Sequence, residues 1–126
     1  MAGIQVLDVK VFDAEGKEEA AGLAYTTNAI TFLEDRLNCS VSAMEQAFNE
    51  GKMETFRVLI LAGLEGWRKR HNKKRPPFTD DDAGDAFDCL GGITGGGADK
   101  LMEFFNAAFP NAPKAEEKDA KNEDPT

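Results

Sequence analysis

Residues 55–67 read TFRVLILAGLEGW, and this stretch decides the fold. From Val58 to Leu64 it contains only apolar residues and one glycine, so a helix formed by it is apolar on nearly every side. A membrane span needs about 20 consecutive apolar residues, whereas this run has seven, bracketed by Arg57 and Glu65. The sequence therefore predicts a central helix buried in the core of a globular domain.

The segment before this helix predicts a β-hairpin. Residues 4–12 (IQVLDVKVF) are rich in β-branched side chains, and charged positions alternate with apolar ones, as in a half-buried strand. Residues 13–16 (DAEG) have the composition of a turn. Residues 20–25 predict a second, weaker strand.

Other segments have the apolar spacing or the capping residues of helices. They are residues 26–37, 40–51, 79–90 and 98–109. Together with the central helix they predict a mainly α fold of the α+β class. In this fold an N-terminal β-hairpin is followed by about four to five packed helices around the central buried helix.

We expect one globular domain over residues 1–109, with a flexible glycine-rich connector at 91–97 (GGITGGG). Residues 110–126 carry many charges and no aliphatic or aromatic side chain larger than alanine. Such a segment does not bury enough apolar surface to offset the entropy lost on ordering. The sequence therefore predicts a disordered acidic C-terminal tail.

The composition limits the classes of partner. The chain has 126 residues and a net charge of −8 at pH 7, which argues against duplex nucleic acid or an anionic membrane as the main partner. Cys39 and Cys89 form no CxxC motif, which favours free thiols over a single disulfide. The N-terminal residues lack the pattern of a signal peptide, so we expect a cytoplasmic protein.

Residues 68–75 (RKRHNKKR) form a basic run with six Lys or Arg. One interpretation is a nucleic-acid patch or a localisation signal. The interpretation that we favour is that these cations complement the dipole at the end of the central helix and face the acidic start of the next helix. A contact to an acidic neighbouring subunit is a third interpretation.

No motif predicts catalysis or a cofactor. Residues 80–85 (DDDAGD) fail as an EF-hand loop, because placing Gly84 at loop position 6 puts Leu90 where the calcium-binding glutamate belongs. Residues 91–97 lack the Lys-Ser/Thr ending of a P-loop. The only histidine, His71, lies in the basic run, and neither cysteine has an evident activating partner. We therefore expect no enzyme activity, no cofactor and no metal site.

Two groups of residues are candidates for binding a protein. The first lies where the central helix turns basic: Trp67, Arg68 and Arg70. The second is an apolar stripe in the last helix: Leu101, Phe104, Phe105 and Phe109. A stripe with helical spacing is more often part of the core. Here, however, it lies between a glycine-rich connector and a charged tail, an arrangement that would let the helix detach and dock in a groove of another molecule.

Five segments carry a resemblance to a known family: residues 25–30 (YTTNAI), 32–37 (FLEDRL), 39–41 (CSV), 56–64 (FRVLILAGL) and 79–90 (TDDDAGDAFDCL). Their order and spacing resemble the tail assembly chaperones of long-tailed bacteriophages and the related proteins of gene transfer agents. The similarity covers residues 4–109. The basic run 68–75 and the connector 91–97 depart from the family pattern, which leaves these two segments unassigned.

The resemblance implies a non-enzymatic chaperone that binds the tape measure protein, keeps it soluble and helps to recruit tail tube protein. It also implies self-association, location in the host bacterial cytoplasm and absence from the mature virion. Two alternatives from other classes stay open. One is a small nucleic-acid-associated regulatory protein that uses the basic run 68–75, and the other is a structural head–tail connector component.

Overall fold

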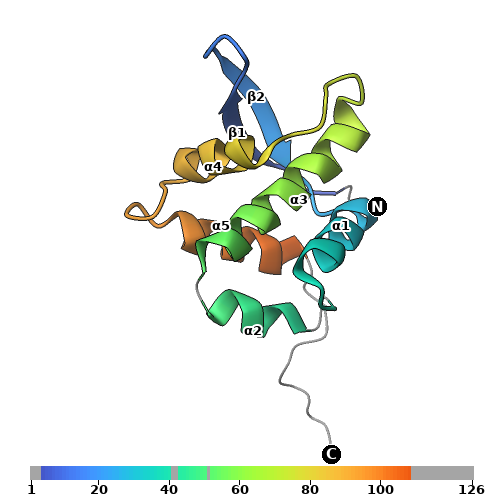
Figure 1. The fold of residues 1–126 in the computed structure, drawn as a ribbon, viewed down its shortest axis with the longest axis vertical. Coiled ribbons are helices and arrows are strands. Elements are labelled where there is room, and N and C mark those ends of the chain that lie inside the picture. Colours follow the sequence, from blue (N-terminus) through green and yellow to red (C-terminus); the bar gives the residue numbers. More distant parts are fainter. Residues whose placement is uncertain (1–3, 41–42, 51, 109–126) are drawn as a thin grey trace, which may run out of the picture.

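The computed structural model describes residues 4–40, 43–50 and 52–108. Within them the elements are β1 (Leu7–Phe12), β2 (Glu18–Leu23), α1 (Thr27–Leu37), α2 (Met44–Asn49), α3 (Met53–His71), α4 (Asp80–Cys89) and α5 (Gly97–Ala108). An N-terminal β-hairpin followed by helices confirms the predicted α+β fold (Figure 1). The tail expected at 110–126 lies outside the described residues.

The central helix is α3, which runs through the middle of the molecule (Figure 1). From Thr55 to Gly66 every residue except Arg57 is buried. The helix extends beyond residues 55–67 at both ends, and the first residues of the basic run belong to it, as the favoured interpretation of that run implies. Among the described residues, no helix combines the length and the apolar character that crossing a membrane requires.

The hairpin pairs Leu7 with Leu23 at its base and Phe12 with Glu18 near its turn. The turn is ordered by the side chain of Asp13, whose Oδ1 accepts hydrogen bonds from the N–H groups of Glu15 and Lys17, both at 2.9 Å. Gly16 supplies the positive φ of 82° that the turn requires. Because side chains alternate along a strand, one face of β1 packs into the core and the other faces solvent.

Two glycines of α3 let the chain after β2 approach the helix closely. A Cβ on Gly66 would lie 2.2 Å from the carbonyl oxygen of Ala24, and a Cβ on Gly63 would lie 3.0 Å from Cβ of Leu23. The Ala24 N–H donates to the carbonyl of Gly63 at 3.0 Å. Glycine weakens a helix by about 1 kcal/mol relative to alanine, and here it makes a tight backbone contact possible.

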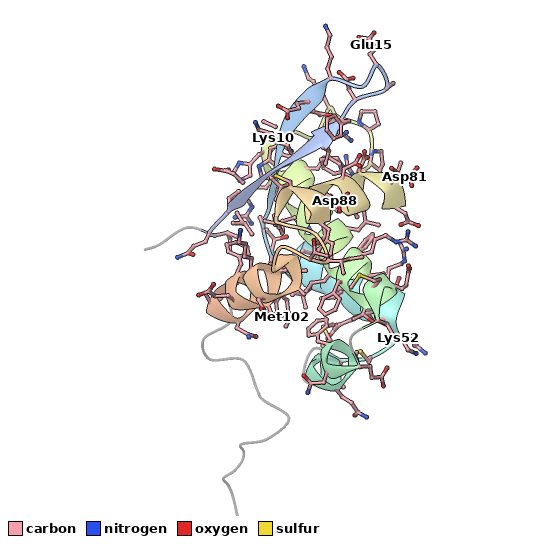
Figure 2. All side chains as sticks on the ribbon, turned by 90° about the vertical axis from the view of Figure 1, so that its left-hand side faces the viewer. Lys10, Glu15, Lys52, Asp81, Asp88 and Met102 are labelled. Atoms are coloured by element: carbon pink, nitrogen blue, oxygen red, sulfur yellow. The ribbon has the colours of Figure 1, made fainter. Side chains whose placement is uncertain are left out.

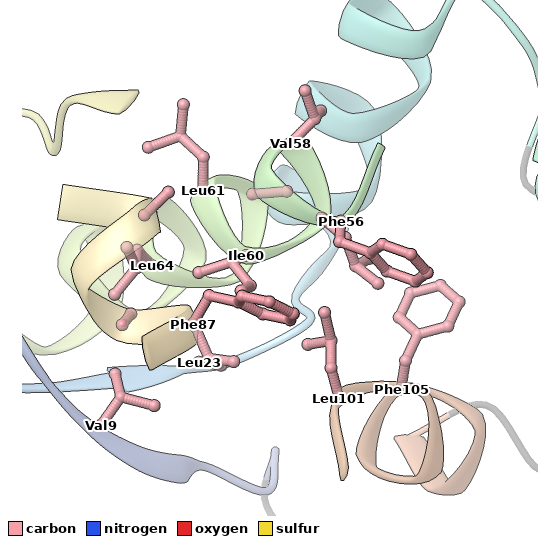
Figure 3. Packing of buried hydrophobic residues seen from close by; sticks show 14 of the residues in the cluster. Val9, Leu23, Phe56, Val58, Ile60, Leu61, Leu64, Phe87, Leu101 and Phe105 are labelled. Carbon is pink, nitrogen blue, oxygen red and sulfur yellow. The ribbon is translucent and has the colours of Figure 1, made fainter. Parts of the chain in front are cut away.

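Buried side chains from both strands and all five described helices form one hydrophobic core. Figure 3 shows where α3 meets its neighbours, with Phe87 of α4 and Leu101 of α5 close to its apolar side chains. The rings of Phe56 and Phe87 stack with centroids 6.4 Å apart. The prediction that residues 55–67 organise the core is therefore confirmed.

The cap of α4 agrees with the sequence, and the connector before α5 contains ordered turns. Thr79 caps α4 in a reciprocal pair of hydrogen bonds with Asp82. The glycine-rich connector consists of hydrogen-bonded turns in the structure, and its predicted flexibility stays a prediction. The Gly95 N–H donates to the Gly91 carbonyl at 2.8 Å, and the Gly97 N–H donates to the Gly92 carbonyl at 3.0 Å. Gly97 already belongs to α5, so the connector is also shorter than expected.

Candidate protein-binding surface

The candidate binding residues lie in two separate places. Trp67, Arg68 and Arg70 are at the C-terminal end of α3, whereas Phe104 and Phe105 are on α5. Phe109 lies outside the described residues. The structure therefore does not assemble one site from the two groups, and each group has to be judged by its own surroundings.

Phe105 is a core residue in the folded chain, with 6% of its surface exposed. Its ring makes edge contacts with Tyr25 and Phe48, at centroid distances of 4.9 and 5.7 Å. Phe104 is half-buried, and its ring lies 6.1 Å from that of Tyr25. In the folded chain the stripe of α5 thus has partners within this chain, and docking of a detached helix through Phe105 stays a prediction.

Tyr25 holds that aromatic cluster in place. Its hydroxyl donates to the carbonyl of Leu59 at 2.8 Å, so the ring of Tyr25 is tied to the backbone of α3. Burial raises the pKa of Tyr25 far above its usual range, so the hydroxyl stays protonated and remains a donor. Tyr25 thus links α5 to the backbone of α3.

Arg68 is also engaged internally. Its Nε and Nη2 donate to the two carboxylate oxygens of Glu65 at 3.0 and 2.8 Å, and its Nη1 donates to the carbonyl of Arg75 at 3.0 Å. Only 12% of the Arg68 side chain is exposed. In the folded chain the guanidinium is therefore directed at a buried carboxylate, and a role of Arg68 in binding a partner stays a prediction.

Glu65 is the centre of this arrangement, and the sequence analysis did not single it out. It is 6% exposed and accepts a third hydrogen bond, from the Phe78 N–H at 2.8 Å. Burial alone would raise the pKa of Glu65, but the bonds from Arg68 and Phe78 outweigh burial and lower it. The only sequence signal was the spacing of three residues between Glu65 and Arg68, which allows an ion pair on a helix.

Arg75 extends the network to the hairpin. Its Nε and Nη2 donate to the carboxylate of Glu19 at 2.6 and 2.9 Å, and its guanidinium lies 3.9 Å from the ring centroid of Phe78. Its Nη2 is also 3.9 Å from Oδ2 of Asp82 in the first turn of α4. The prediction that the basic run faces the acidic start of the next helix is therefore confirmed at Arg75.

The remaining basic side chains are exposed and form a surface that we call the basic corner: Lys69, Arg70, His71, Lys73 and Lys74. None of them forms an ion pair with another residue in the described part of the chain. The C-terminal dipole of α3 favours cations at this position. The basic corner is thus a region of positive charge on a chain whose net charge is −8.

Trp67 lies beside the basic corner and is half-buried. Its ring covers Gly22 of the hairpin, where an added Cβ would lie 2.8 Å from Cδ1 of Trp67. The ring centroids of Phe78 and His71 are 6.2 and 6.3 Å from that of Trp67. The exposed part of this side chain gives the basic corner an apolar border, a combination that suits a protein partner with acidic groups.

Beside the basic corner, we searched the described residues for clusters of metal ligands. Among those residues no group of three or more His, Cys, Asp or Glu side chains is arranged to hold a metal ion. Cys39 is half-buried and Cys89 is exposed, and both are free thiols. Comparisons with protein-family models, with curated proteins and with solved structures found no match to this chain.

Proposed function

We propose that this chain is a non-enzymatic tail assembly chaperone of a long-tailed bacteriophage or a gene transfer agent. It binds the tape measure protein in the host cytoplasm, keeps it soluble, helps to recruit tail tube protein and associates with itself. The proposal comes from the resemblance of the five segments in residues 25–90 to that family. The basic corner is the observation on the folded chain that supports a protein-binding role.

The basic corner suits this role because its cations are exposed, while the arginines on either side of it are held in ion pairs. Arg68 and Arg75, which flank it in sequence, are held by Glu65 and Glu19. The cations between them are exposed and lie beside the apolar edge of Trp67. Charged groups at the rim of an interface raise the association rate and select the partner. An acidic stretch of a long helical protein is the kind of surface that such a corner would bind.

The proposed function is tested by co-expressing the chain with the tape measure protein of the same phage. We expect the tape measure protein to be soluble and to co-purify with the chain, and to aggregate when the chain is omitted. The variant Arg70→Glu/Lys73→Glu should weaken co-purification. A control with the same net charge, Lys17→Glu/Lys100→Glu, changes exposed cations elsewhere and should behave like the wild type. A tape measure protein that stays insoluble with the wild-type chain would contradict the proposal.

Two other functions give different results. A nucleic-acid-associated regulator, which the basic corner also suits, would bind DNA or RNA with an affinity that falls steeply as salt rises. A structural head–tail connector would be found in purified particles, whereas a chaperone would be absent from them. A binding titration at low salt and an immunoblot of purified virions therefore separate the three candidates.

A further inference from the structure

The outer edge of β1 has no strand beside it. In the described residues the sheet has only two strands, and β1 pairs with β2 alone. In Figure 2 β1 crosses in front of β2, so that this edge faces the viewer. Backbone groups along such an edge can pair with another strand, and natural proteins usually protect edges of this kind.

The hydrogen-bond pattern of the hairpin determines which residues present their backbone at this edge. The Asp13 N–H donates to the Lys17 carbonyl at 2.9 Å, so Asp13 and Lys17 are a hydrogen-bonded pair. In an antiparallel ladder such pairs alternate with non-bonded ones. Counting back from Asp13, the odd-numbered residues of β1 bond to β2. Asp8, Lys10 and Phe12 therefore direct their N–H and C=O groups to the free edge.

The side chains of these same residues form a symmetric pattern on the solvent-exposed face. Asp8 and Lys10, which are oppositely charged, lie one residue before and one after Val9. Val6 and Phe12 lie three residues before and three after Val9, and they are large apolar side chains that are 36% and 45% exposed. If a second strand runs antiparallel to β1 about an axis at Val9, each acidic position therefore faces a basic one near the centre. At the two ends, an apolar position faces an apolar one.

We propose that β1 pairs with β1 of a second copy of this chain, antiparallel and about a two-fold axis at Val9, to form a four-stranded sheet. In this register Asp8 lies opposite Lys10 of the second copy, and Val6 lies opposite its Phe12. Opposite-charge and apolar cross-strand pairs both stabilise a sheet. The exposed parts of Val6 and Phe12 are then covered by the second copy.

The charges also exclude the neighbouring registers. A shift of the axis to position 8 places Asp8 opposite its own copy, and a shift to position 10 does the same for Lys10. Like charges directly opposite each other destabilise a pair of strands. A slip of one residue between the strands would place the outward backbone groups opposite residues whose groups point inward, so the ladder would not form. Of these registers, the Val9-centred one matches both the backbone and the charges.

A second copy is favoured over an unrelated peptide because the edge is complementary to itself. The intramolecular contact of Lys10 with Glu18, at 3.3 Å, is between exposed side chains, and exposed pairs of this kind contribute little. The inference rests on the proposed function only in that it specifies the self-association included there. It is therefore tested on the isolated chain, with no tape measure protein present.

Sedimentation velocity over a range of concentrations tests the pairing. The wild-type chain should self-associate, and either Asp8→Lys or Lys10→Asp should raise the dissociation constant about tenfold or more, because both charge pairs become repulsive. The double swap Asp8→Lys/Lys10→Asp should restore association. An equimolar mixture of the two single variants should also associate, because each then supplies the charge that the other lacks. Both positions are exposed, so thermal unfolding followed by circular dichroism should show intact folds.

Amide hydrogen exchange gives a second measurement that does not depend on side-chain charge. The N–H groups of Asp8, Lys10 and Phe12 should become protected as the wild-type concentration rises, and should stay unprotected in the single variants. A wild-type chain that remains monomeric would overturn the inference. So would single variants that associate like the wild type, or a mixture of the two that fails to associate. The solubility of a co-expressed tape measure protein is a separate readout, so failure of this interface is distinguishable from failure of the proposed function.

Discussion

Two ion pairs with the same chemistry and spacing lie on α3, one buried and one exposed. Glu65 and Arg68 are three residues apart, and their side chains are 8% and 12% exposed. Glu54 and Arg57 are also three residues apart, and their side chains are 57% and 42% exposed. Replacing each glutamate by glutamine removes a charge and keeps the shape, so the two variants compare a buried, multiply bonded glutamate with an exposed one that has a single contact.

We expect Glu65→Gln to lower the free energy of unfolding by about 3 kcal/mol, because removing one partner of a buried ion pair leaves the other charge uncompensated. The glutamine amide would also direct a donor at the Arg68 guanidinium or at the Phe78 N–H, which now donate to Glu65 at 2.8–3.0 Å. Glu54→Gln should cost about 0–1 kcal/mol, since exposed pairs are solvated and screened.

The assay is urea unfolding at pH 7, followed by far-UV circular dichroism and by tryptophan fluorescence. The chain has one tryptophan, and Trp67 lies two residues after Glu65, so its fluorescence reports on this part of α3 directly. A loss of about 3 kcal/mol corresponds to a drop in Tm of about 10 °C for a domain of this size. If the two variants were equally stable, the argument that Glu65 anchors the basic corner would be refuted.

The remaining predictions concern packing, pH and the aromatic cluster. Gly66→Ala should destabilise the fold, because the new Cβ would meet a backbone oxygen at 2.2 Å. Gly84→Ala on α4 should instead stabilise the fold by about 0.5–1 kcal/mol, because its Cβ meets nothing within 4 Å. Chemical denaturation of both variants checks this pair of predictions. The pKa of Glu65 is lowered in the folded chain, so its contribution to stability is present above the unfolded pKa and is lost as the pH falls below about 4. Melting curves between pH 3 and 7, compared with those of Glu65→Gln, measure this loss. Burial, followed by repulsion from neighbouring carboxylates, raises the pKa of Asp85, so Asp85→Asn should stabilise the chain at pH 7, and the gain should shrink in acid. Phe105→Ala should cost about 3–5 kcal/mol if its ring is part of the core, and an unchanged Tm would instead show that α5 is not held by this contact.

The fold was predictable from the sequence where local pattern and burial agree. The apolar run from Val58 to Leu64, the alternation in β1 and the cap at Thr79 each have a local physical cause that can be recognised in the sequence. The cations after Trp67 mark the end of the core but not of the helix. They end the buried part of the helix, while its backbone continues for four residues to His71.

The candidate surface was predictable only in part, because it depends on contacts between distant segments. Arg75 bonds to Glu19, 56 residues earlier in the chain, and no spacing rule connects the two. For the same reason the basic run did not reveal that Arg68 and Arg75 are engaged internally while the residues between them are exposed. In the last helix, the apolar stripe gave no indication of whether its partner was in this chain or in another.

The hairpin is fastened to the helical body at two points, at its base by the hydrogen bond between Ala24 and Gly63, and near its turn by Glu19 and Arg75. These two attachments along its length hold the hairpin in one orientation relative to the helical body. A load applied to the edge of β1 would be transmitted to α3 as a torque. In a pair of copies joined through that edge, the two bodies would therefore be held at one fixed angle to each other, and that angle would set the shape of the dimer.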